Sequence, residues 1–188
     1  MNISPNFGNI LANSVAIDVA RTLIPSYRYD LLQSNVQLAL ETGMGDCKAV
    51  ALILAALRPD IAFVRHVTRP TKGVRKAASA YIHYLVLDRE VGTVIHSTGA
   101  PLSVPGAHIK AVPVADFAQN WSIDGEKRAK PASAVSALRE IAEGSEHEVR
   151  KFSGYELSMM VEDPQDRLVG STMEDLRIEA LERLIDVV

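Results

Sequence analysis

The segment Lys48–Leu57 constrains the fold of this chain more than any other part of the sequence. It contains the run AVALILAAL and is followed by Arg58-Pro59. The run predicts a helix, and the Arg58-Pro59 step ends it. Because this helix is apolar on nearly every side, it has to be buried over most of its surface. We therefore expect it at the centre of the fold.

Helices are expected before this segment and strands after it. The apolar residues of Asn13–Leu23 recur on one helical face, and Ser26–Leu40 has leucines that favour a second helix. After the central segment the chain changes to runs of β-branched and aromatic residues, which favour strands. We expect these strands at Ile61–Val67, Ala80–Asp88 and Thr93–Ser97. A short turn separates the last two, so they should form an antiparallel hairpin.

The C-terminal part of the chain is expected to be mainly helical. A fourth strand at Ala111–Val114 and a short helix at Ala115–Trp121 would complete the core, followed by helices at Ser133–Ala142 and Met173–Val187. The predicted organisation is an α+β core over residues 1–121 and a helical region over residues 122–188 packed on it. In this fold class, the central helix packs against the antiparallel sheet.

Composition excludes several classes of partner. The 188 residues have a net charge of −3, which favours neither nucleic acid nor an anionic membrane surface as a partner. No apolar run approaches the roughly 18 residues of a membrane-spanning helix. The single cysteine rules out a disulfide within the chain and fits a reducing compartment. We expect a cytoplasmic protein, or one secreted into a host cell without a Sec signal peptide. The oligomeric state stays open.

That single cysteine, Cys47, lies where a glycine-rich turn meets the central helix, in TGMGDCKAVALILAAL. The free N–H groups and the dipole of a helix N-terminus favour a thiolate, and the same N–H groups can stabilise an oxyanion. The neighbouring Asp46 has the opposite effect, because a carboxylate raises the pKa of a nearby thiol. Two interpretations follow: Cys47 is a nucleophile, or it is a half-buried structural cysteine.

A nucleophilic cysteine needs a base, usually a histidine held by a third group. His83 lies in the middle of the expected strand YIHYLVLD, where an imidazole is costly unless it is paired or lines a cleft. Strand alternation directs Asp88 away from His83. His96 on the neighbouring strand is therefore the first choice for the orienting group, and Asp88 is the second. The alternative is a structural histidine with satisfied hydrogen bonds.

The order of these elements over Thr42–Ala100 resembles the transglutaminase-like (papain-like) superfamily of cysteine enzymes. The resemblance implies Cys47 as the nucleophile and His83 as the general base. The strand that would contain the family's Asp-Pro-Thr has His96-Ser97-Thr98 instead, and His83 is followed by Tyr84-Leu85 rather than Ala-Trp. A histidine does not stabilise an imidazolium as a carboxylate does. Gln33 and Gln37 are the candidates for an oxyanion side chain.

The predicted function is cysteine-dependent acyl transfer on protein amide groups. The chain would be a glutamine deamidase, a transglutaminase or a peptidase, and by resemblance a bacterial effector or toxin. Its substrate would be a protein or peptide, with no organic cofactor. The histidine spacings match no zinc signature, so no metal is expected. The alternative is a non-catalytic protein-interaction module with the same fold.

Overall fold

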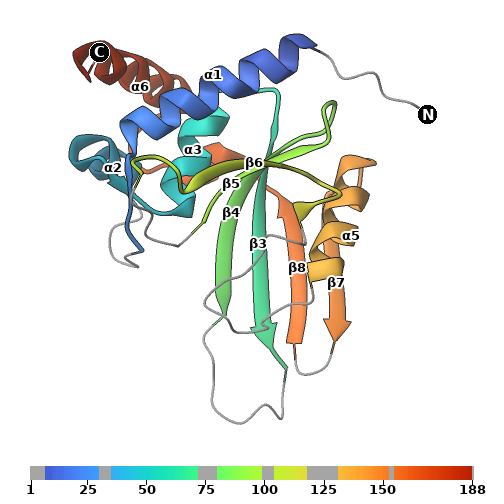
Figure 1. Cartoon of the computed structure of the whole chain (residues 1–188). Helices are drawn as coiled ribbons and strands as arrows, with labels where there is room; N and C mark the ends of the chain where they lie inside the picture. The colour runs from blue at the N-terminus through green and yellow to red at the C-terminus, as the bar shows by residue number, and fades with distance from the viewer. Residues whose placement is uncertain are drawn as a thin grey trace.

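The computed structural model of the chain describes residues 7–29, 35–71, 80–98, 104–117, 131–152 and 155–187. They form an α+β fold with a six-stranded antiparallel sheet, which confirms the predicted class (Figure 1). The strands are β3 (Ala62–Pro70), β4 (Tyr81–Asp88), β5 (Thr93–Ser97), β6 (Ile109–Pro113), β7 (His147–Phe152) and β8 (Tyr155–Val161). Their order across the sheet is β6-β5-β4-β3-β8-β7.

Helix α3 (Cys47–Leu57) is the centre of the larger of two cores, as predicted. Nine of its residues are buried, from Cys47 to Ala56. The helices α1 (Phe7–Leu23), α2 (Val36–Thr42) and α6 (Met173–Val187) pack around it. On its remaining side α3 contacts β3, β4 and β5. An apolar helix of this kind is stable only when other elements cover it on all sides, and this arrangement covers it.

The opposite face of the sheet has its own core beneath helix α5 (Pro131–Ala142). Leu85 and Leu87 of β4 meet Leu138 and Ile141 of α5 in this core, together with Phe117. We call the two sides of the sheet the α3 face and the α5 face. Side chains alternate between the two faces along each strand, so consecutive residues of a strand join different cores.

The predicted helix Ser26–Leu40 is wrong in its first part. Ser26–Tyr27 is a short strand, β1, which pairs in parallel with β2 (Met44–Gly45), and α2 covers only Val36–Thr42. Asn35 caps α2, and the chain then leaves the helix through Gly43, which has a φ of 65°. The leucine spacing of Ser26–Leu40 predicts a helix. Its first residues form a strand instead, because they pair with Met44–Gly45.

The expectation of a helical C-terminal region is also wrong in part, because β7 and β8 lie within it. β8 pairs with β3 from Val64↔Val161 to Pro70↔Tyr155, so the segment after residue 131 completes the sheet rather than only packing on it. β7 has the sequence HEVRKF, whose charges are typical of an edge strand and conceal its period. The boundary predicted at residues 121 and 122 lies outside the described residues.

The other predicted elements are present. Asn13–Leu23 lies in α1, Ser133–Ala142 lies in α5, and the strands and the last helix agree with their predicted bounds within a few residues. The short helix expected at Ala115–Trp121 lies largely outside the described residues. Within the described part of the chain, every helix is too short or too polar to span a bilayer.

Candidate functional site

Cys47 is the first residue of α3, as predicted, but its surroundings favour the neutral thiol. Its side chain is buried, with 5% exposed. Burial raises the pKa of Cys47 to about 12, and the Asp46 carboxylate contributes to the rise. Asp46 also caps the helix, because its Oδ1 accepts hydrogen bonds from the N–H groups of Lys48 and Ala49, both at 3.0 Å. Backbone hydrogen bonds from Tyr84, Cys47 and Lys48 lower the pKa of the thiol, but burial and Asp46 outweigh them, so the thiol stays protonated at neutral pH.

Strand alternation places Cys47 and His83 on different faces of the sheet. Tyr84 and Val86 share the α3 face with Cys47 in one core. His83 alternates with Tyr84 along β4 and therefore shares the α5 face with Leu85. Two of the three predicted catalytic residues do meet, because the ring centroids of His83 and His96 are 5.8 Å apart. The nucleophile and the base of the predicted site do not.

His83 belongs to a row of buried histidines on the α5 face. His66 of β3 lies directly opposite His83 in the register, and the ring of Phe117 covers His96 at 5.1 Å between centroids. The hydroxyl of Tyr81 lies 3.4 Å from Nδ1 of His83. Burial lowers the pKa of His66 to about 3 and of His96 to about 4, and it also holds the pKa of His83 well below 6.5. All three imidazoles are neutral at pH 7.

Asp88, the second choice for the orienting group, is engaged elsewhere. It lies on the α3 face at the end of β4, where its Oδ2 accepts hydrogen bonds from Asn13 at 2.9 Å and from Arg58 at 3.2 Å. This buried network joins α1, the end of α3 and β4. As for metals, the described residues contain no group of three or more His, Cys, Asp or Glu side chains arranged to hold an ion.

Tyr84 occupies the α3 face beside Cys47, and the sequence analysis missed it. Its ring stacks on Phe63 at 5.4 Å, and the guanidinium of Arg167 lies 6.0 Å from its centroid. Glu162 accepts hydrogen bonds from Arg167 Nε at 2.8 Å and from Arg65 Nη1 at 3.4 Å. Burial raises the pKa of the Tyr84 phenol. A protonated phenol is a hydrogen-bond donor and not a base at neutral pH.

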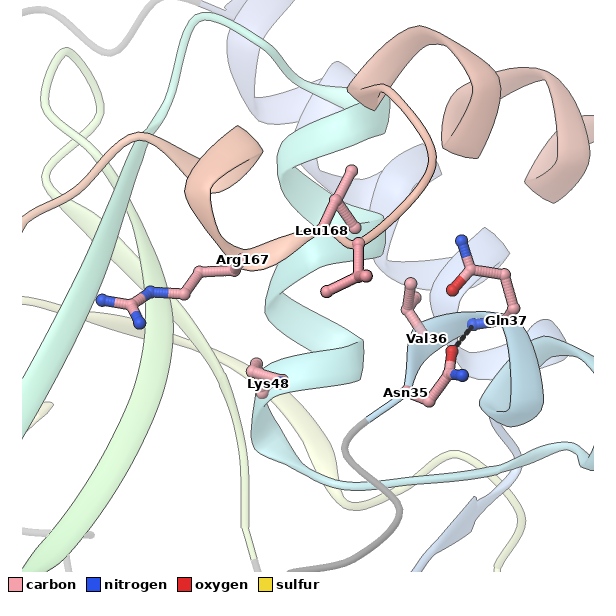
Figure 2. Close-up of a pocket in the computed structure, with 7 residues that line it drawn as sticks. Asn35, Val36, Gln37, Lys48, Arg167 and Leu168 are labelled. Carbon is pink, nitrogen blue, oxygen red and sulfur yellow. Dashed lines mark hydrogen bonds between the residues drawn. The ribbon is translucent and has the colours of Figure 1, made fainter.

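A cavity of about 230 Å³ opens beside the N-terminal end of α3, and we call it the α3 cavity (Figure 2). The close-up shows contributions from the start of α2, the start of α3 and the segment that leads to α6. Gln37 comes from α2, and its Nε2 donates to Ser171 at 2.8 Å. The other predicted oxyanion candidate, Gln33, lies outside the described residues. The cavity is lined by Asn35, Val36, Gln37, Lys48, Arg167, Leu168 and Val169.

Comparisons with known proteins add no neighbour to this picture. No family model, no curated protein and no solved structure matches the chain. The resemblance to transglutaminase-like enzymes therefore stays a prediction from the sequence, and the functional argument depends on the geometry of the described residues.

Proposed function

We propose that this chain is a non-catalytic protein-interaction module in which a cysteine begins the central helix. The observation that supports the proposal most is the placement of Cys47 and His83 on opposite faces of the sheet. A cysteine nucleophile and its base have to lie within hydrogen-bond reach. The thiol of Cys47 contacts the backbone of Tyr84, whereas the side chain of His83, one residue earlier, alternates to the other face of β4.

The side chains beside Cys47 support the same conclusion. The phenol of Tyr84 stands on the face where a base would be needed, and its raised pKa keeps it protonated. Asp46 is committed to capping α3, and its negative charge opposes formation of the thiolate. The thiol thus has a raised pKa and no suitable base in Tyr84 or Asp46, which is the reverse of an activated nucleophile.

Helix α6 supplies a surface that supports the binding part of the proposal. Its inner face, with Leu176 and Ala180, is buried in the α3 core. Its outer face has a second apolar stripe at Ile178, Leu181 and Ile185, which are 46%, 41% and 78% exposed. The helix also has five acidic and two basic residues. Charge complementarity therefore favours a partner helix with its own apolar stripe and basic flanks.

The binding part can be tested with a synthetic amphipathic helix of leucine and lysine as the probe. We expect saturable binding in a fluorescence anisotropy titration, with affinity falling as salt rises. A leucine and glutamate helix of the same length is the matched control and should bind far more weakly. Equal binding of the two peptides would contradict the proposed charge preference. A stable dimer in sedimentation, lost in Ile185→Glu, would identify a second copy of the chain as the partner instead.

The non-catalytic part can be tested by alkylation of Cys47 with iodoacetamide at pH 7.5. We expect the native protein to react far more slowly than the same protein unfolded in guanidinium chloride, where the thiol has its ordinary pKa of about 8.5. Acyl transfer remains the competing function, because Cys47 does begin the central helix as the resemblance implies. A native thiol that reacts faster than the unfolded one would support the enzyme.

A further inference from the structure

We propose that the α3 cavity binds the C-terminal residue of a partner peptide, through its carboxylate and an aliphatic side chain. This inference rests on the proposed function, since it names the part of a partner that this region recognises. It depends on three properties of the cavity: the sign of its polar lining, its apolar wall and its size.

The polar lining of the cavity favours an anion. Lys48 and Arg167 contribute positive charge, Asn35 and Gln37 contribute amides, and no carboxylate is among the lining residues in the described part of the chain. Arg167 already donates to Glu162 through Nε and Nη2, at 2.8 and 2.5 Å. Its charge is therefore largely balanced within the protein.

Lys48 supplies the charge that a ligand would meet. Its charge acts on Asp46: burial raises the pKa of Asp46, and the charge of Lys48 opposes that rise. The Asp46 carboxylate is itself held by the backbone N–H groups of Lys48 and Ala49. Lys48 lines the cavity and forms no salt bridge with another described residue, so its ammonium group can pair with an incoming carboxylate.

The apolar wall and the size of the cavity specify the rest of the ligand. Val36, Leu168 and Val169 supply the apolar lining. In Figure 2 Val36 and Leu168 lie away from the guanidinium of Arg167. Its volume of about 230 Å³ is below the roughly 300–1,000 Å³ of typical small-molecule sites. It therefore suits one residue of a peptide, with an aliphatic side chain against the wall and a carboxylate toward Lys48.

The test uses N-acetyl-leucine and N-acetyl-leucinamide, which differ only in the charge of the carboxyl group. We expect N-acetyl-leucine to bind saturably to the full chain, as followed by amide chemical shifts in NMR, and N-acetyl-leucinamide to bind at least tenfold more weakly. The variant Lys48→Gln should weaken binding of N-acetyl-leucine about tenfold, as expected when one charge-assisted hydrogen bond is lost. The matched control is Lys110→Gln, an exposed lysine of β6 outside the cavity, which should bind as the wild type does.

Three results would overturn the inference. They are equal binding of the acid and the amide, unchanged binding in Lys48→Gln with a wild-type circular dichroism spectrum, and inorganic phosphate binding as tightly as N-acetyl-leucine. The last would indicate a general anion site without aliphatic selectivity. If the cavity does not bind N-acetyl-leucine as expected but Cys47 is unreactive, the proposed function still stands. A fast, base-assisted Cys47 would instead remove the proposed function whatever the cavity binds.

Discussion

The two faces of the sheet bury their polar groups by different means. The α3 face pairs charges: Asp88 with Arg58, and Glu162 with Arg65 and Arg167. The α5 face instead buries neutral imidazoles, kept uncharged by burial, and its ion pairs, Arg150 with Glu140 and Glu148, lie half-buried at the edge strand β7. The neutral histidines make the α5 face sensitive to mild acid. The comparison also shows why the predicted Cys–His pair does not form, since neighbouring residues of β4 belong to different faces.

The largest effect expected from this difference is a loss of stability in mild acid that comes from the α5 face. The pKa values of His66 and His96 are about 3 and about 4 in the folded protein, below the ordinary 6.5, so the unfolded state binds more protons. The stability from their neutral forms is complete above pH 6.5 and is lost as pH falls. By pH 5 each of these two histidines costs about 2 kcal/mol, and His83 and His108, whose pKa values burial also lowers, add to the loss.

Urea unfolding at pH 7 and pH 5 measures this loss. His96→Gln should recover about 2 kcal/mol of it, while His147→Gln, which removes an exposed histidine, should recover none. The Asp60 carboxylate, whose pKa the Arg58 guanidinium holds below 3.8, titrates only at lower pH, so it does not contribute in this window. A free energy of unfolding that is the same at both pH values would contradict the account of the α5 face.

On the α3 face, Asp88→Ala should destabilise the protein by about 3 kcal/mol, because it leaves Arg58 buried without one of its two carboxylates. Asp60→Ala removes the other, more exposed carboxylate of the same arginine and should cost below about 1 kcal/mol. Urea unfolding at pH 7 compares the two variants. If the two variants lose the same free energy of unfolding, the burial of Asp88 does not make its pair with Arg58 stronger than the pair of Asp60 with Arg58.

Tyr84→His would move an imidazole to the face of Cys47. A protonated imidazole there should lower the pKa of the thiol by at least one unit, so the alkylation rate at pH 7.5 should rise about tenfold over the wild type. Tyr84→Phe removes the hydroxyl without adding a base and should leave the rate near that of the wild type. A rate that ignores both substitutions would indicate that Tyr84 does not face the thiol.

The smallest effect on stability is expected at the outer stripe of α6. Ile185 is 78% exposed, so Ile185→Glu should change the free energy of unfolding by less than about 0.5 kcal/mol. The same substitution should weaken binding of the basic amphipathic peptide, because it places a charge in the apolar stripe. A large loss of stability would show that the stripe is covered within the chain and is not a surface for a partner.

The position of α3 and the division of β4 between two faces could be predicted from the sequence, because both depend on local patterns of apolar residues. The apolar run fixed the place of α3, and the alternation of YIHYLVLD correctly divided β4 between two faces. Alternation does not say which face the central helix covers. That choice depends on long-range packing, and it decides whether Cys47 meets His83 or Tyr84.

Strands β7 and β8 were missed for different reasons. β7 is a charged edge strand that pairs only with β8, so its sequence has no clear period of its own. β8 does alternate, with Tyr155, Leu157, Met159 and Val161 at every second position, and this pattern could have predicted a strand. The contact between Tyr84 and Cys47 also depends on long-range packing. A sequence pattern could suggest it only once the face covered by the central helix was known.

The most direct test of the central claim is the pH dependence of Cys47 alkylation in the wild type and in His83→Ala. The account predicts a slow reaction from pH 6 to pH 9 in both proteins, with profiles that overlay, since the thiol titrates near 12 and His83 lies across the sheet. A thiolate that titrates well below 8.5 in the wild type, and shifts upward in His83→Ala, would contradict it and establish a Cys–His pair.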